Sequence, residues 1–531
     1  MSAKFKQLNP FELKFAVTDL LDKINAVSDI QNCLDDFELL DAQEDKKIIS
    51  KILFKELTKV QKDKTPIICF LLEHFVPKDE LVNKLWETLK NPNLQTEVKI
   101  TVLNLLRELD ADWSYEAAEE LEDGNELLDA HTKQLLNTAI INPEIQIDFL
   151  DFMATIRVQD KITLLNSLSE DFSSDALANI LIPVFMSDPD SPAGKEALKL
   201  LADTKSVLAF HVLEEMKNMT TGELLQEIKR SLSTIKISGM REDKTKEFYK
   251  EILSNSKPDK FYLTYPDGHG DVAMIFTRKT EEGKIRFVSI VINVATGIKD
   301  CFGFFEISEF ECSKILERFL KNEKTVDIDS KSFKTILYNA ELTTIKNNQN
   351  SWKLPYEYVC WKSLLVDIEY ESQTIEELLQ EQILPAKVNN DAITNLLQMG
   401  VSTHWFLDYK YSDEFENLLK ALKDTKDIDS LLEQNIDKVF YSEEKIEWIN
   451  KLILSAYIKS VIGKDEQAQI LYGITQDDLV LKEMFGQILQ RSIYEYLTVV
   501  KYDKNIESFG LTYEDIEGKI KYIEDKWVQN V

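Results

Sequence analysis

Apolar residues recur with the period of an α-helix through most of the chain. One helical face is spaced especially clearly and comprises Val98, Val102, Leu105, Leu106 and Leu109. Thr65 followed by Pro66 is a typical helix start, because threonine can accept a free N–H and proline lacks one. The first ~235 residues therefore predict successive helices of about 10 to 18 residues joined by short polar turns.

The clearest helix pair spans residues 176–203. A helix carrying Leu-Ile-Pro-Val-Phe precedes an Asp-Pro-Asp turn at 188–190, and a second helix follows with Lys-Glu-Ala-Leu-Lys-Leu-Leu-Ala-Asp. This stretch resembles a HEAT repeat, and the resemblance extends diffusely over residues 40–220. It implies a helical solenoid, because paired helices with one apolar face can bury that face only by stacking on their neighbours.

Residues 261–303 interrupt the helical pattern, and five of the chain's 15 glycines fall there. Short runs of β-branched and aromatic residues alternate with turns, which predicts an antiparallel meander of three or four strands. The predicted strands are 261–265, 272–279, 285–294 and, at the edge, 298–305. Two amphipathic helices follow, one capped by Ser308 and Glu311 and one over 332–346, and we expect them on one side of the sheet.

The helical pattern returns after residue 375 without a clear repeat, including helices at 443–462, 477–500 and 513–527. The predicted fold class is mainly α, with a HEAT-like solenoid, a small α+β domain and a C-terminal helical region. The predicted domains are 1–240, 245–370 and 371–531. A chain of 531 residues is long enough for about three cores.

Charge is distributed unevenly along the chain. The net charge of −30 argues against general nucleic-acid binding, because phosphate contacts need clustered Lys and Arg. Residues 229–300, however, hold 14 Lys/Arg against 10 Asp/Glu, which is +4. This basic centre, with Arg278 and Arg286 in predicted strands, could bind an anionic partner. The alternative is a solvated helix and a hairpin whose cations protect a sheet edge.

Several features indicate a cytoplasmic protein. No run approaches the roughly 20 apolar residues of a membrane helix, and residues 1–7 lack the apolar region of a secretory signal. The five cysteines are odd in number and form no CxxC pair, as expected for reduced thiols. We expect no membrane partner and no cofactor.

One turn of the meander carries side chains that could do chemistry. Asp267, His269 and Asp271 alternate with glycines, so they could hold a divalent metal or present His269 as a general base. Lys299, between Gly297 and Gly303, could bind a phosphate. The alternative is a tight turn that uses Asp and Gly for their backbone geometry. No zinc spacing is formed by Cys301, Cys312, Cys360 and His269, so no metal site is assigned.

An aromatic segment follows the meander and contains Trp352, Tyr356, Tyr358 and Trp361. Trp and Tyr dominate the energetic centres of protein interfaces, so this segment is a candidate binding surface. The alternative is that these aromatic side chains pack in the interface between two domains.

Three hypotheses of function fit these observations. The first is a protein-interaction scaffold or adaptor without catalysis, since solenoids offer extended binding surfaces and the sequence has no nucleophile elbow, HExxH or kinase set. The second is an enzyme acting on a phosphate-bearing or nucleic-acid substrate, with His269, Asp267, Asp271 and Lys299 as its working residues. A third hypothesis is an acidic surface that mimics nucleic acid and blocks a basic protein.

Overall fold

The structure is a computed structural model. It describes residues 7–24, 33–59, 64–109, 133, 136–240, 247, 249–250, 253, 256–322, 325–348, 353–398, 402, 404–425, 427–440, 443–503 and 505–529. In these ranges every helix is too short or too polar to span a lipid bilayer.

Two compact units divide the chain, Met1–Asn137 (unit 1) and Thr138–Val531 (unit 2). The division falls inside the predicted first domain, and the predicted boundaries near 240 and 370 both fall inside unit 2. Helices before the meander, the meander itself and the C-terminal helices therefore belong to one compact body.

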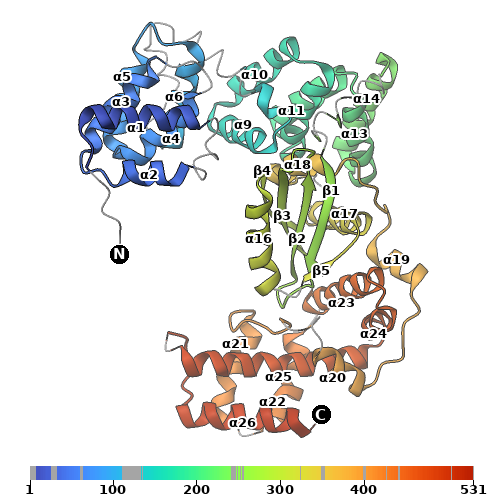
Figure 1. Ribbon diagram of the computed structural model, residues 1–531. Helices are drawn as coiled ribbons and strands as arrows, with labels where there is room; N and C mark the ends of the chain where they lie inside the picture. Colours follow the sequence, from blue (N-terminus) through green and yellow to red (C-terminus); the bar gives the residue numbers. More distant parts are fainter. Residues whose placement is uncertain are drawn as a thin grey trace. The chain divides into compact units, whose positions relative to one another are not determined.

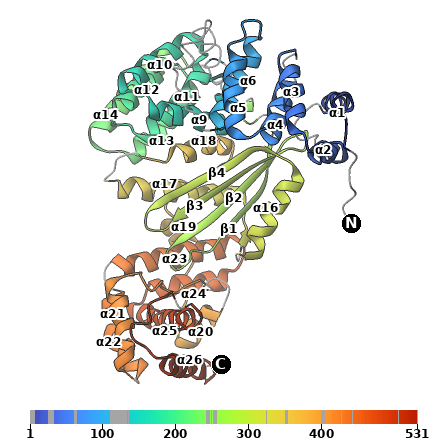
Figure 2. The ribbon, with the colours of Figure 1, turned by 90° about the vertical axis from the view of Figure 1, so that its left-hand side faces the viewer.

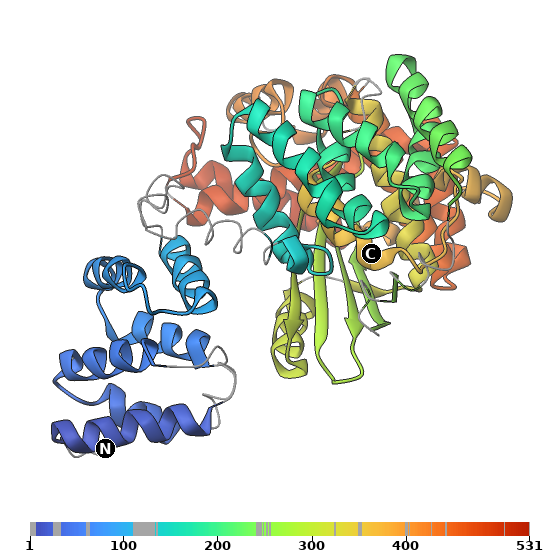
Figure 3. The ribbon, with the colours of Figure 1, turned by 90° about the horizontal axis from the view of Figure 1, so that it is seen from above.

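Unit 1 is helical in its described part. Its helices are α1 (Pro10–Lys23), α2 (Leu34–Asp41), α3 (Lys46–Leu57), α4 (Thr65–Phe75), α5 (Lys78–Leu89) and α6 (Thr96–Glu108). Their apolar stripes meet in one core, in which Leu20, Leu53 and Leu72 are fully buried. Figure 3 shows these helices in blue, lying side by side. The predicted apolar face from Val98 to Leu109 is confirmed, because all five of its residues are buried.

The first part of unit 2 is also helical. It comprises α9 (Pro143–Thr155), α10 (Val158–Asp171), α11 (Ser174–Ser187), α12 (Pro192–Asp203), α13 (Val207–Met219) and α14 (Gly222–Ser238). The predicted helix pair at 176–203 is confirmed as α11 and α12, which pack directly on each other. Ser191 caps α12 by accepting the Gly194 N–H at 3.0 Å, and Pro192 follows at its first position.

The meander forms a five-stranded antiparallel sheet in the order β4-β3-β2-β1-β5. The strands are β1 (Lys257–Thr264), β2 (Asp271–Lys279), β3 (Ile285–Asn293), β4 (Gly297–Ile307) and β5 (Thr325–Asp327). The predicted meander is confirmed, and β5 is a strand that the sequence analysis missed. A strand of three residues is too short to show a two-residue alternation of apolar positions.

Helices cover both faces of the sheet, whereas the sequence analysis placed them on one side. α16 (Glu309–Asn322) packs through Cys312 and Leu316 on Ile275 and Phe287. α17 (Ser330–Asn347) packs on the opposite face, where the Phe333 ring contacts those of Phe261 and Phe276. Ile275 and Phe276 are neighbours in β2, so their side chains point to opposite faces. Figure 1 shows α16 and α17 on the two sides of the strands.

A third helix, α18 (Tyr356–Lys362), fills the space between the edge strand β4 and the helices α9 and α11. Its Trp361 is buried, and the ring lies so close to Gly303 of β4 that a Cβ there would approach the ring to 2.7 Å. The same Cβ would approach the Phe287 carbonyl oxygen to 2.7 Å. Glycine at position 303 therefore sets how closely α18 approaches the sheet.

The C-terminal part of unit 2 is helical, as predicted. It comprises α19 (Ile375–Gln382), α20 (Asn390–Gln398), α21 (Asp413–Ala421), α22 (Ile428–Val439), α23 (Glu443–Val461), α24 (Asp465–Thr475), α25 (Asp478–Tyr502) and α26 (Tyr513–Gln529). These helices join the sheet through the β1–β2 turn. There the Trp405 Nε1–H donates to the Pro266 carbonyl at 2.8 Å, and Lys451 Nζ donates to the Gly268 carbonyl at 2.7 Å.

Gly303→Ala tests the close approach of α18 to β4. The added methyl group must displace the Trp361 ring or the Phe287 carbonyl, and overpacking of this kind costs about 1–3 kcal/mol. We expect a lower free energy of unfolding in urea titrations followed by tryptophan fluorescence. Gly518→Ala is the control, since a Cβ at this exposed helical position meets nothing within 4 Å. Equal stability of Gly303→Ala and the wild type would contradict the proposed contact.

Candidate protein-interaction groove

A groove of about 1040 Å³ runs along α25 in unit 2. The α25 residues that line it begin at Leu479, pass through Glu483 and Gln487 and end at Glu495, following one stripe of the helix. The opposite face of α25 is buried in the core through residues such as Leu481, Phe485 and Ile488. Because an α-helix rises about 1.5 Å per residue, the stripe exposes a floor about 24 Å long. We name this cavity the α25 groove.

Two helices form the walls of the α25 groove. α22 contributes Leu432 and Ile436, and α20 contributes Thr394 and Leu397. Figure 2 shows α25 between α22 and α20, with α26 below it. The walls thus combine aliphatic and short polar side chains.

The same stripe of α25 continues under α26. The Tyr494 ring of α25 packs at a tilt against the Trp527 ring, with 4.7 Å between ring centroids, and Lys501 pairs with Glu517 at 3.1 Å. α26 therefore runs antiparallel to α25 and covers the C-terminal half of the stripe. Trp527, near the end of α26, also lines the groove. The open half of the stripe is the place that a helix in line with α26 would occupy.

Gly486 lies in the floor of the α25 groove, in the middle of a 25-residue helix. Its backbone is not left-handed, so no turn requires glycine there. A Cβ at this position would meet only Ile436 Cδ1 at 3.6 Å, which is ordinary contact. Glycine makes the helix about 1 kcal/mol less stable than alanine would, and it leaves the floor without a side chain. An incoming backbone could therefore approach α25 closely here.

Most charged side chains of the groove have partners within the protein. Lys526 and Tyr522 of α26 both bind the Asp429 carboxylate, and Lys482 pairs with Asp437 at 2.6 Å. Arg491 Nη1 donates to the Ser402 carbonyl at 2.6 Å, and burial lowers the pKa of its guanidinium although Glu495 nearby opposes this. These contacts hold the walls and the end of the groove in place.

The sequence analysis found the helices of this region but not the groove. One sequence signal could have indicated it, namely a glycine within a long run of strong helix formers, Gly486, which no turn explains. The walls come from helices up to about 90 residues away along the chain, so their convergence could not be read from local pattern.

The predicted chemical cluster around His269 is a folded turn. Asp267 Oδ1 accepts the N–H groups of His269 and Asp271, both at 2.9 Å, and Gly270 has a positive φ of 78°. Asp271 accepts hydrogen bonds from Asn293 Nδ2 at 2.7 Å and from Lys299 Nζ at 2.6 Å. The His269 side chain is exposed. The structure therefore brings Asp271 and Lys299 together, while the Asp267 carboxylate is used by the backbone.

In the described part of the chain, no three His, Cys, Asp or Glu side chains converge as metal ligands. Cys301 is buried, and burial raises the pKa of its thiol well above the usual range. Cys312 packs in the core between α16 and the sheet, as its helical phase predicts.

Arg278 and Arg286 of the predicted basic centre lie inside unit 2, each 1% exposed. They face each other across β2 and β3. Arg278 binds both carboxylate oxygens of Asp367, at 2.8 and 2.9 Å, and also donates to the Ser256 and Leu364 carbonyls. The Arg286 guanidinium stacks on the Phe305 ring at 3.9 Å, and burial together with the Arg278 charge lowers its pKa to about 10.

The aromatic segment lies mainly in the interior of unit 2. Tyr358 and Trp361 are each 1% exposed, and the Tyr358 hydroxyl donates to Glu341 at 2.5 Å. Tyr356, which is half-buried, donates its hydroxyl to Asp151 of α9. Trp352 lies outside the described residues. The described members of this segment connect α9, α17 and β4.

A buried charge cluster lies beside this segment. Lys362 of α18 pairs with Glu341 of α17 at 2.8 Å and with Glu215 of α13 at 3.1 Å. Both carboxylates raise the pKa of Lys362, which overcomes the opposing effect of burial. The adjoining cavity has a volume of only about 10 Å³, close to that of one water molecule and too small for a ligand. The cluster joins three helices and offers no substrate site.

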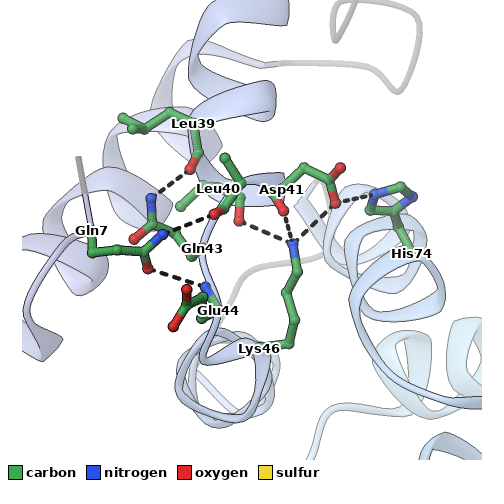
Figure 4. Close-up of polar contacts among 9 residues, drawn as sticks. Gln7, Leu39, Leu40, Asp41, Gln43, Glu44, Lys46 and His74 are labelled. Carbon is green, nitrogen blue, oxygen red and sulfur yellow. Dashed lines mark hydrogen bonds and ion pairs between the residues drawn. The ribbon is translucent and has the colours of Figure 1, made fainter. Parts of the chain in front are cut away.

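Unit 1 has a cavity of about 390 Å³ beside the α2–α3 turn, lined in part by Lys46 and Phe75. Figure 4 shows the polar contacts of this turn. Asp41 accepts from Lys46 Nζ at 3.0 Å and lies 3.1 Å from His74 Nε2, and these two neighbours lower the pKa of the Asp41 carboxyl. Gln7 bridges the Ala42 carbonyl and the Glu44 N–H. The polar groups of this turn therefore form hydrogen bonds that stabilise the turn itself.

No family model matches the chain, and comparison with curated proteins and with solved structures found no match either. Its function must therefore be inferred from geometry, and among the three cavities described above the α25 groove has the greatest volume.

Asp367→Asn tests whether Arg278 is held by its buried ion pair. The substitution leaves a guanidinium that is 1% exposed without its counter-charge, and breaking a buried pair costs several kcal/mol. We expect a loss of about 3 kcal/mol, at the low end of that range because the Asp367 side chain is 37% exposed. Urea unfolding would measure it. Glu317→Gln, which removes an exposed pair with Lys321, should leave the unfolding midpoint unchanged.

Gly486→Ala tests whether glycine in the groove floor has a structural reason. The methyl group fits beside Ile436, so we expect the variant to gain about 1 kcal/mol in free energy of unfolding. Gly518→Ala, at an exposed position of α26, should gain a similar amount. A loss of stability in Gly486→Ala alone would show that glycine is needed for folding and not for an open floor.

Proposed function

We propose that this chain is a protein-interaction adaptor, and that unit 2 binds a helical segment of a partner protein in the α25 groove. The single observation that carries the proposal is the half-covered stripe of α25. α26 occupies one half of it, and the other half lies open between α20 and α22. Grooves between helices are a recurrent site for amphipathic helices, whose apolar side chains anchor at successive turns.

The volume of the groove agrees with a peptide better than with a small metabolite. About 1040 Å³ is at the upper end of the range for small-molecule pockets, and the floor of about 24 Å corresponds to roughly four helical turns. The groove also holds aliphatic anchors such as Leu432 and Val480, as helix-binding surfaces do.

The helices α9–α14 support the same proposal. α10, α12 and α14 pack on each other in sequence, as do α11 and α13, so alternate helices form two layers. This alternation is what a HEAT-like solenoid requires, and we include a solenoid of that kind in the proposed function as an additional surface for proteins. We also propose a cytoplasmic location, because a reducing compartment suits a chain with five free thiols, four of them buried.

Site-specific cross-linking tests the adaptor proposal. A photoreactive benzoylphenylalanine at Gln490, in the groove, should capture a partner from lysate, and the same group at Lys521, on the exposed face of α26, should not. Capture at Gln490 should be lost with Gly486→Leu, which fills the floor, and kept with Gly518→Leu. Capture that is equally strong with Gly486→Leu would contradict binding in the α25 groove.

A further inference from the structure

Three carboxylates that line the α25 groove, Glu433, Glu483 and Glu495, form no ion pair within the described ranges, and two of them are exposed. The exposed two are Glu433 of α22 and Glu483 of α25. The groove residues Asp429 and Lys482, by contrast, each form an ion pair. The groove therefore presents negative charge that the protein does not neutralise.

The two exposed carboxylates flank the apolar part of the groove. Glu433 lies between Leu432 and Ile436 on α22, and Glu483 precedes the bare floor at Gly486 by one turn. A helix lying on this floor would place apolar side chains against Leu432 and Ile436. Residues one turn away on either side of its apolar stripe would then reach the two carboxylates.

We infer that the occupant of the α25 groove is an amphipathic helix with lysine or arginine on both borders of its apolar face. This inference rests on the proposed function and adds the chemistry of the partner. Charge complementarity carries it, because a basic border pairs with Glu433 and Glu483 while an acidic border meets like charge. The net charge of −30 adds long-range attraction for the same class of partner.

Fluorescent model helices of about 18 residues, long enough to cover the floor, test the inference with the full chain. One peptide has a leucine stripe bordered by lysines, a second has glutamines in place of the lysines, and a third has glutamates. Fluorescence anisotropy at physiological salt should show binding of the lysine peptide and at least about tenfold weaker binding of the glutamate peptide. Gly486→Leu should abolish binding of the lysine peptide, and Gly518→Leu should leave it unchanged.

Charge-matched variants separate the groove from the acidic surface as a whole. The double substitution Glu433→Gln with Glu483→Gln should lower the affinity for the lysine peptide by about fivefold, as expected for the loss of two exposed ion pairs. Glu466→Gln with Glu514→Gln changes the net charge equally at exposed positions outside the groove and should have no effect. Equal weakening by both double variants would overturn the inference, because it would show diffuse attraction.

The remaining outcomes distinguish the partner's chemistry from the site. The glutamine peptide could bind as tightly as the lysine peptide, with binding abolished by Gly486→Leu. The groove would then bind helices, but the inference that the partner helix is basic would be wrong. If Gly486→Leu changes the affinity of none of the peptides, both the inference and the proposed function are wrong. Gln490→Trp provides a second block of the groove should Gly486→Leu not fold, as judged by circular dichroism.

Discussion

The packing of unit 2 depends above all on residues 353–368, a segment that we call the wedge. Its helix α18 lies between the edge strand β4 and the helices α9 and α11. Trp361 reaches the β4 backbone because residue 303 is glycine, and Lys362 joins α13 to α17 through two carboxylates. Asp367 then neutralises the buried Arg278 of β2. Charges this deeply buried are tolerated only when paired, so the wedge, the sheet and the helices must assemble together.

The wedge explains why the residues on both sides of positions 240 and 370 belong to unit 2. A domain boundary needs few contacts across it, but the 353–368 segment contributes side chains to the helices before the sheet and to the sheet itself. The β1–β2 turn makes a similar connection on the other side. Asp267 shapes that turn, and Trp405 and Lys451 bind its carbonyl groups, so the C-terminal helices are held against the sheet. Asp267, one of the predicted candidates for catalysis, therefore shapes the connection between the sheet and the C-terminal helices.

The α25 groove follows from this architecture. α25 is long because its buried face crosses the C-terminal helices, yet α26 pairs with only half of its outer face. α20 and α22 stand on either side without closing over the open half. Packed helices therefore bound the open half, and Gly486 leaves part of its floor without a side chain.

Local pattern alone determined the mainly helical fold, the meander and the helix pair at 176–203, because the periods of 3.6 and 2 residues and the capping residues act over a few neighbours. For the aspartates and glycines of the 267–271 turn, the same pattern allowed two interpretations, a chemical site and a tight turn. Local sequence could not distinguish between them. Tertiary structure alone decided that Arg278 and Arg286 are buried, that α16 and α17 lie on opposite faces, and that α20, α22 and α25 enclose a groove. Those outcomes depend on which faces of the helices and strands pack together, although the segments lie tens to hundreds of residues apart in the sequence. Burial and charge pairing arise only from this packing, so no separate segment determines them.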